Sequence, residues 1–214
     1  MNALRASLSA EKAIGILAIV YTVGIAGTLI PIHEQFLLLT PLNLLFSITV
    51  VLAYHLRWNS QTWIFLLLCY AAGFGVEVLG VQSGVIFGEY SYGRTLGWKL
   101  WDTPLIIGLN WCMLVYCSGV VINHLMGEQP WWVKAPLAAA LMTGLDVLIE
   151  PVAIRYDFWT WAGEGIPLQN YLAWYAIALV MLAVFYHIAP KTRNKVAVAL
   201  FILQCLFFGI LGLS

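Results

Sequence analysis

Seven apolar runs, each close to 20 residues long, constrain this chain more than any other feature of its sequence. An α-helix rises about 1.5 Å per residue, so such a run matches the roughly 30 Å hydrocarbon core of a bilayer. The runs cover residues 12–31, 36–56, 62–81, 103–125, 132–153, 170–189 and 195–213. We predict an all-α polytopic membrane protein: residues 1–214 form one transmembrane domain, a bundle of about seven helices.

The composition requires lipid as the surrounding solvent. Hydrophobic residues make up 62% of the chain and charged residues only 9%, whereas a soluble domain has about 25% charged residues. The net charge is zero and there is no basic run, so we expect no nucleic-acid partner. The first run is too long for a signal peptide and no small-residue cleavage site follows it, so we expect it to be a helix.

Breaks between the runs coincide with proline and glycine, at Pro31, at 127–130 and at Pro190. The two long connections are 82–102 and 154–169. With seven spans, one side of the membrane collects Arg5, Lys12, Arg57, Lys134, Lys191, Arg193 and Lys195, and the other only Arg94, Lys99 and Arg155. Since basic loops stay in the cytoplasm, we expect a cytoplasmic N-terminus in the inner membrane of a bacterium.

Ionisable and amide side chains inside the spans gather at one level of the predicted bundle. Insertion of a charged residue at the centre of a span costs roughly 2.5–3.5 kcal/mol, so such residues indicate function. Glu77, Asp146 and Glu150 come late in spans that run outward, while Asn110 and Asn170 come early in spans that run inward, with Asp102 at the mouth of one of these. We therefore expect all six in the outer half of the bilayer.

Asp146 and Glu150 lie four positions apart and share one helix face. Pro151 follows, so we expect the helix to kink or end there. Two carboxyl groups this close in a low dielectric do not both ionise cheaply, so at least one should carry a proton at neutral pH. Three roles remain open: a catalytic acid, which we favour; a proton or cation pathway; and structural pairing with Arg155, Arg94 or Lys99.

Aromatic residues cluster around the two long connections. They include Phe87, Tyr90, Tyr92, Trp98 and Trp101 in the first, and Tyr156, Phe158, Trp159 and Trp161 in the second. Most suit an interfacial aromatic belt. Ring faces also stabilise cations, so an acid beside an aromatic wall suits carbocation chemistry on an apolar alkene.

Several other classes of site and protein are disfavoured. The four cysteines form no CxxC pair, and the histidines form no HxxxH pair, so we expect no metal site. Retinal proteins need a lysine in the last span, and 196–214 contains none. Membrane prenyltransferases need two Asp-rich motifs and basic residues for a diphosphate; here only the Asp146–Glu150 pair resembles one motif.

Two blocks resemble the membrane carotenoid-biosynthesis protein family, whose known members are carotenoid 1,2-hydratases. The first block is GVQSGVIFGEYSY at 80–92, then Leu96-Gly97 and DTPL at 102–105. The second is LDVLIEPVA at 145–153, then FWTW at 158–161 and GIPLQNYLAW at 165–174. Ile86 replaces a usual proline and Glu150 a common aspartate, but neither change removes an acid or an aromatic ring.

The resemblance implies addition of water across the C1–C2 double bond of an acyclic ψ-end group, as in lycopene or γ-carotene, without cofactor or metal. The substrate would enter from the lipid. We expect Asp146 or Glu150 to donate the proton, and Glu77 to tune them or to act as base toward water. Asp102, Asn110 and Asn170 are the candidates to position that water, and the cation's pocket would be lined by Tyr90, Tyr92, Trp111, Trp159, Trp161 and Trp174.

The competing class is a non-catalytic membrane protein, either a proton-coupled or small-molecule transporter or a carotenoid-binding protein. A transporter commonly has paired broken helices in two related halves. This chain has a single proline-interrupted acidic span.

Overall fold

Seven helices long and apolar enough to cross a membrane make up most of the structure. The structure is a computed structural model that describes residues 8–30, 33–188 and 192–214. The first two spans are α2 (Ala10–Leu29) and Gln35–Ala53, the latter built from α3 (His33–Leu37) and α4 (Thr40–Ala53). The others are α5 (Ser60–Ser83), α6 (Ile106–Met126), α7 (Trp131–Arg155), α8 (Leu168–Ile188) and α9 (Lys195–Leu213).

The spans confirm the predicted all-α membrane fold. Each helix agrees with its predicted range to within a few residues. Of the residues invoked from the sequence, Arg5, Pro31, Pro190 and Lys191 lie outside the described residues.

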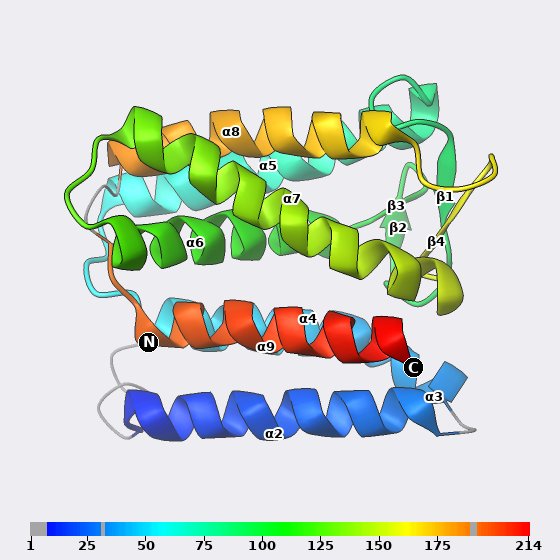
Figure 1. Ribbon diagram of the computed structural model, residues 1–214, viewed down its shortest axis with the longest axis horizontal. Helices are drawn as coiled ribbons and strands as arrows, with labels where there is room; N and C mark the ends of the chain where they lie inside the picture. Colours follow the sequence, from blue (N-terminus) through cyan, green and yellow to red (C-terminus); the bar gives the residue numbers. More distant parts are fainter. Residues whose placement is uncertain (1–7, 31–32, 189–191) are drawn as a thin grey trace.

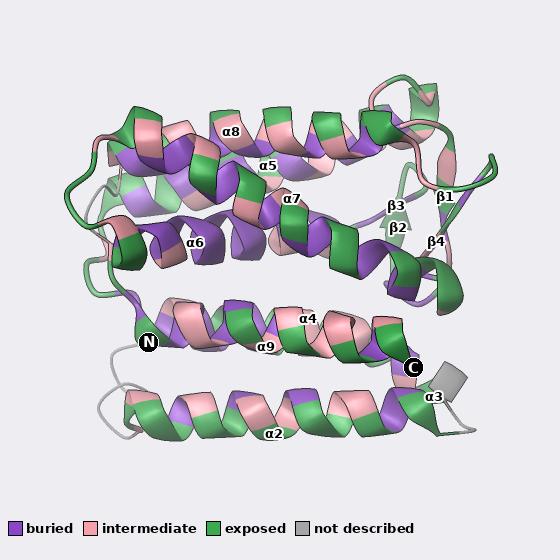
Figure 2. Ribbon diagram, viewed as in Figure 1, coloured by how far each residue is buried: buried purple, intermediate pink, exposed green. Residues whose placement is uncertain are grey.

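Helix α6 forms the centre of the bundle and contacts α4, α5, α7, α8 and α9. It is the most buried span, since 78% of its most apolar stretch is buried inside the protein. Figure 2 shows most of α6 in the colour of buried residues. Small residues permit this close packing. An added Cβ would come within 2.7 Å of the Tyr70 ring at Gly108, and within 2.6 Å of the Phe185 ring at Gly119.

The other helices lie around α6 in layers. Helices α5, α7 and α8 cover one side of it, α9 and α4 lie on the other, and α2 packs on α9 as the outermost layer (Figure 1). Side-chain caps fix where several helices begin: Asn59 accepts a hydrogen bond from the Thr62 N–H at 2.8 Å, and Asn194 accepts from the N–H groups of Val196 and Ala197.

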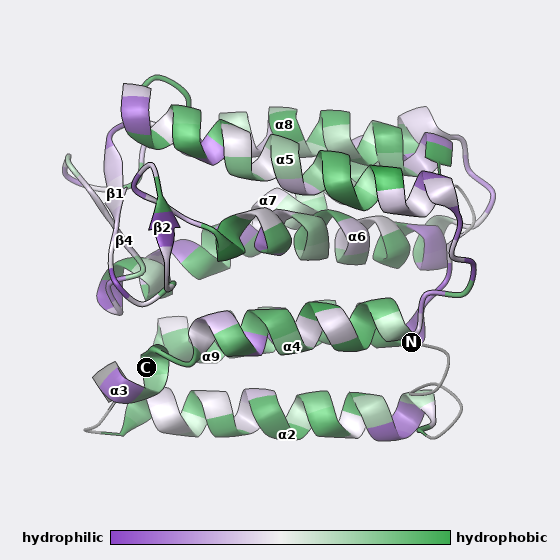
Figure 3. Cartoon of the chain, turned by 180° about the vertical axis from the view of Figure 1, so that it is seen from behind, coloured by the Kyte–Doolittle hydropathy of each residue, from purple (hydrophilic) through white to green (hydrophobic). Residues whose placement is uncertain are grey.

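The two long connections fold against one end of the bundle as short strands. Strand β1 (Tyr90–Tyr92) pairs antiparallel with β4 (Trp159–Trp161), and β2 (Lys99–Leu100) pairs with β3 (Thr103–Pro104). Hydrophilic residues gather at this end and at the opposite end, with apolar helices between them (Figure 3). The pair of β1 and β4, here called the β1–β4 ribbon, joins connections that are about 70 residues apart in the chain.

Two helix ends differ in detail from the sequence expectation. The fourth span begins at Ile106 rather than at 103, because Thr103 and Pro104 belong to β3. Helix α7 does not end at Pro151 but continues to Arg155. A proline removes one backbone hydrogen bond, and a helix inside a membrane bundle tolerates this loss because its neighbours compensate for it.

Candidate active site

One face of the β1–β4 ribbon presents four aromatic residues to the bundle. Tyr90 pairs with Trp161 and Tyr92 with Trp159 across the two strands. Alternate residues of a strand point to the same face, so all four side chains lie on one side of the ribbon. The rings of the two pairs contact each other, with centroids 5.2 Å and 6.0 Å apart. Each ring carries an O–H or N–H group that can donate a hydrogen bond.

Glu77, near the end of α5, accepts three of the hydrogen bonds at this site. Its Oε2 accepts from the hydroxyl groups of Tyr90 at 2.6 Å and of Tyr92 at 2.7 Å. Its Oε1 accepts from Trp111 Nε1 of α6 at 2.9 Å. The side chain is only 3% exposed, so these donors replace the water that would otherwise solvate the carboxyl group.

Glu150 of α7 is held from the other strand of the ribbon. Its Oε2 accepts from Trp161 Nε1 at 2.9 Å and from Trp159 Nε1 at 3.1 Å. Its Oε1 accepts from Asn170 Nδ2 of α8 at 3.1 Å. The ribbon therefore connects two buried carboxyl groups that come from different helices.

Asp146 lies one turn before Glu150 and shares a hydrogen-bond donor with it. Asn170 Nδ2 also donates to Asp146 Oδ2 at 3.1 Å, so the two carboxyl groups lie on either side of one nitrogen atom. Asp146 is fully buried, and its Oδ1 has no hydrogen-bond partner among the described residues. Asp146 is thus the least satisfied of the three acids.

The three acids line one small cavity of about 40 Å³, here called the acid chamber. A buried water needs roughly 10–15 Å³ of such space, so the chamber has room for a few water molecules. Its lining contains eleven of the twelve residues predicted as the site, namely Glu77, Tyr90, Tyr92, Asn110, Trp111, Asp146, Glu150, Trp159, Trp161, Asn170 and Trp174. Sequence reasoning missed three apolar members of the wall, which are Phe87, Ile107 and Ile149.

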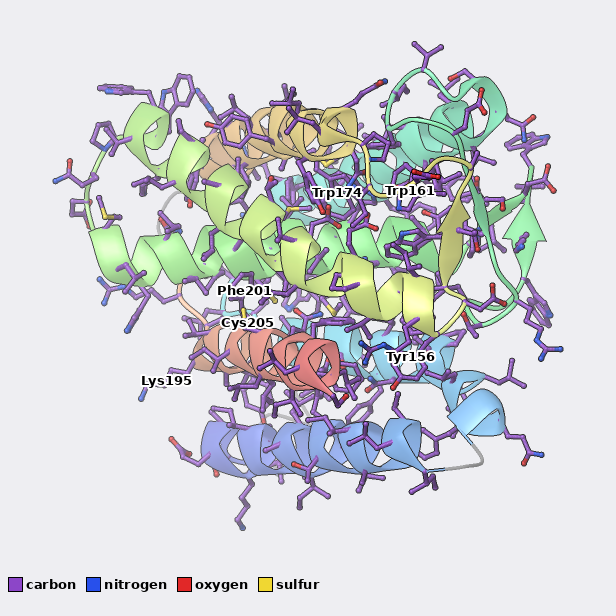
Figure 4. The ribbon with its side chains drawn as sticks, turned by 45° about the vertical axis from the view of Figure 1, so that its right-hand side comes forward. Tyr156, Trp161, Trp174, Lys195, Phe201 and Cys205 are labelled. Atoms are coloured by element: carbon purple, nitrogen blue, oxygen red, sulfur yellow. The ribbon has the colours of Figure 1, made fainter. Side chains whose placement is uncertain are left out.

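Two stacked tryptophan rings form another part of the chamber wall. Trp111 and Trp174 stack with centroids 4.4 Å apart and an interplanar angle of 23°. In Figure 4, Trp174 and Trp161 lie near one another where α8 meets the ribbon. Helical spacing could have indicated two of the three missed residues, because residues three positions apart lie on the same helix face. Ile107 precedes Asn110 by three positions, and Ile149 follows Asp146 by three.

Asp102 is the predicted site residue that the structure places elsewhere. It is exposed and sits with Trp101 in the turn between β2 and β3, where both residues have positive φ, 51° and 60°. Two-residue hairpin turns use such conformations, and aspartate tolerates them better than most residues. Its Oδ2 accepts from Gln82 Nε2 at 3.3 Å. Asp102 therefore does not share the chamber of the other acids.

The structural alternative considered from the sequence was that the acids form ion pairs with Arg155, Arg94 or Lys99. None of the described residues that line the acid chamber is a lysine or an arginine. Arg155 instead donates to the carbonyl oxygen of Leu211, and Lys99 to that of Tyr92. Among the residues that the structure describes, no group of three or more His, Cys, Asp or Glu side chains has the geometry to hold a metal ion.

The two tyrosines of the ribbon are fixed as hydrogen-bond donors. Burial raises the pKa of Tyr90 and of Tyr92 well above the usual value for a phenol, and the neighbouring charge of Glu77 raises both further. Both hydroxyl groups therefore keep their protons throughout the physiological range.

Comparison with known proteins identifies the family. Over 118 residues the chain is 29% identical to bisanhydrobacterioruberin hydratase of Haloarcula japonica. The match covers 52% of this chain but only 40% of that protein, so the chain spans less than half the length of this relative. No solved structure gives a significant match. The sequence profile of the carotenoid biosynthesis proteins matches residues 39–214, which include both blocks noted in the sequence. The chain belongs to the carotenoid biosynthesis protein family.

Proposed function

We propose that this protein is a carotenoid hydratase, which adds water across the C1–C2 double bond of an acyclic ψ-end group such as that of lycopene or γ-carotene. The observation that supports this most strongly is the set of three buried carboxyl groups on one small, aromatic-walled chamber. The similarity to a protein named as a hydratase supports the reaction class. Hydration of an isolated alkene needs a strong proton donor, a stabilised cation and a water molecule, and each has a candidate in the chamber.

Asp146 is the proton donor in this proposal. Glu77 and Glu150 each accept three hydrogen bonds, which stabilise a carboxylate, whereas Asp146 accepts a single one. A fully buried carboxyl group with an unpartnered oxygen is costly as an anion. Asp146 therefore holds a proton and delivers it to C2 of the alkene, which leaves a tertiary cation at C1.

Aromatic faces and Glu77 stabilise that cation. The stacked rings of Trp111 and Trp174 present their π faces within a desolvated wall, where a cation–π contact contributes about 2 kcal/mol or more. Three hydrogen-bond donors stabilise the ionised form of Glu77, and in this proposal its negative charge balances the positive charge at C1.

Water completes the reaction by attack on C1. Asn110 and Asn170 position the water molecule, and Glu150 accepts the proton that the water loses as the new C–O bond forms. The net change is the addition of one water molecule, without oxidation or reduction. Asp146 regains its proton from Glu150 through a chamber water, since both carboxyl groups lie beside the same Asn170 nitrogen.

The orientation in the membrane is part of the same proposal. The described basic residues Lys12, Arg57, Lys134, Arg193 and Lys195 lie at the ends of helices away from the β1–β4 ribbon. Basic residues favour the cytoplasmic side. The N-terminus is therefore cytoplasmic, and the acid chamber lies toward the outer face of the membrane.

Pigment analysis tests the proposed reaction. The protein is produced in a bacterium that makes lycopene or γ-carotene, and the extracted pigments are analysed by mass spectrometry. We expect a carotenoid heavier by one water, and growth in ¹⁸O-labelled water should place the label in its hydroxyl group. If the oxygen instead came from O₂, the enzyme would be an oxygenase and the hydratase mechanism would have to be abandoned.

A further inference from the structure

A second, much larger pocket lies beside the acid chamber. Its volume is about 460 Å³, and its wall is almost entirely apolar. Helices α2, α4 and α9 form most of this wall, together with α3, the first turn of α6 and the region of Phe158. It will be called the apolar pocket. Because α2 is the outermost layer of the bundle, the pocket lies between the body of the bundle and its periphery (Figure 1).

The apolar pocket and the acid chamber share part of their walls. Ile107, Asn110, Ile149 and Trp159 line both of them. Among the described residues the Asn110 side chain has no hydrogen-bond partner, while Trp159 Nε1 donates to Glu150 in the chamber. A molecule in the apolar pocket therefore lies against the same residues that enclose the three acids.

The mouth of the apolar pocket faces the lipid. Ile19 and Val23 of α2, and Leu42 and Phe46 of α4, line the pocket and are also exposed; Ile19 is 64% and Leu42 62% exposed. In a helix that crosses the membrane, exposed apolar side chains meet lipid rather than water. The opening between α2 and α4 thus admits apolar molecules from the bilayer.

We propose that the apolar pocket binds the polyene chain of the carotenoid, which enters from the lipid between α2 and α4 and extends its end group past Asn110 and Trp159 into the acid chamber. The proposal rests on the hydratase function. A polyene is favoured over a lipid acyl chain because the pocket shares four wall residues with the acid chamber and because aromatic rings such as those of Phe36, Phe207 and Phe158 suit stacking on a conjugated chain.

Matched substitutions test the pocket. Leu44 of α4 lines it, whereas its neighbour Leu45 is exposed and does not. Leu44→Trp fills the pocket and Leu45→Trp places the same ring on the lipid-facing surface. A second pair lies on α2: Gly24 lines the pocket, with the flexible Phe207 ring nearest to it, whereas nothing lies within 4 Å of Gly15. Gly24→Phe and Gly15→Phe form this pair, in case one variant fails to fold.

Two readouts are measured on detergent-purified protein from the lycopene-producing strain. One is the fraction of carotenoid that is hydrated; the other is carotenoid bound per protein, measured with Asp146→Asn present so that turnover does not remove the ligand. We expect both to fall about tenfold or more in the pocket variants, because burial of the chain is lost. The control variants should behave like the parent protein.

The outcomes separate the two proposals. If the parent protein hydrates carotenoid and properly folded pocket variants do so equally, the pocket proposal is wrong while the hydratase function stands. If bound phospholipid falls in the pocket variants but bound carotenoid does not, the pocket is a lipid site and the proposal is again overturned. If the parent protein hydrates nothing but the pocket variants lose bound carotenoid, the pocket proposal stands and the hydratase function fails.

Discussion

Tyr90 and Trp161 face each other across the β1–β4 ribbon, with ring centroids 5.2 Å apart, and donate hydrogen bonds to different carboxyl groups. Tyr90 holds Glu77 of α5, and Trp161 holds Glu150 of α7. Two extramembrane connections thereby fix the spacing of acids on two transmembrane helices. The ribbon forms part of the wall of the acid chamber and supplies four of the hydrogen-bond donors to its acids, from Tyr90, Tyr92, Trp159 and Trp161.

Removing the ribbon hydroxyl groups tests this arrangement. In Tyr90→Phe and Tyr92→Phe, Glu77 loses one donor each, while the ring packing stays. A hydrogen bond to a charged group contributes about 1.5–3 kcal/mol, so we expect hydration to fall roughly 10- to 100-fold in each variant. Tyr70→Phe is the control, because Tyr70 donates to the Leu105 carbonyl oxygen and to no acid. Equal activity in all three variants would show that Glu77 needs no donors from the ribbon.

Asn170 gives a second test, since its Nδ2 joins Asp146 to Glu150. Asn170→Ala should lower hydration strongly at an unchanged protein level, because the proton donor and the proton acceptor lose their shared contact. Gln169→Ala is the matched control: Gln169 donates to the backbone carbonyl oxygen atoms of Val85 and Ile86 instead. Initial rates in membrane vesicles measure both variants. An active Asn170→Ala enzyme would show that hydration does not need the contact that Asp146 and Glu150 share through Asn170.

The sequence predicted the acid cluster correctly because hydropathy and helix direction determine depth. Glu77, Asp146, Glu150 and Asn170 all fall near the same ends of antiparallel spans, and the structure brings them to one cavity. Asp102 was placed at the mouth of the fourth span, but the β2–β3 turn carries it to the surface. Spans alone do not reveal a hairpin of two-residue strands.

The ribbon was not predicted, although a signal for it exists. Tyr90 and Tyr92, and likewise Trp159 and Trp161, alternate with polar residues in the period of a strand. Strands of three residues are too short to stand out, and their pairing joins segments about 70 residues apart. The apolar pocket could not be predicted from the sequence either, because it depends on how α2, α4 and α9 pack beside α6.

The stacked tryptophans offer a test of cation stabilisation. Trp174→Phe keeps a π face beside the chamber, whereas Trp174→Leu keeps only apolar volume. If the ring stabilises the C1 cation by about 2 kcal/mol, the leucine variant should be about 30-fold slower than the phenylalanine variant. Rates measured at saturating carotenoid separate this effect from weaker binding. Equal rates for the two variants would argue that the ring only packs.

Reporter fusions test the proposed orientation. Fusions within 82–102 and 154–169 should read as external, because these connections form the ribbon and its flanks at one end of the bundle. Fusions within 127–130 should read as cytoplasmic, because this turn joins α6 to α7 at the other end. Alkaline phosphatase activity reports the external sites. Opposite signals from the two long connections would conflict with their pairing in the ribbon.

The most direct test of the whole account is the hydration rate of Asp146→Asn. Asparagine keeps the shape of the side chain but has no acidic proton to give, and general acid catalysis typically contributes about 10²–10⁴-fold. Asp102→Asn is the matched control, since it makes the same change at an acid outside the chamber, and Glu150→Gln is measured beside it. We predict that Asp146→Asn accumulates as a folded membrane protein and loses hydration by about 10²-fold or more, while Asp102→Asn hydrates at the parent rate. Near-normal hydration by Asp146→Asn at a normal protein level would contradict the assignment of Asp146 as the proton donor.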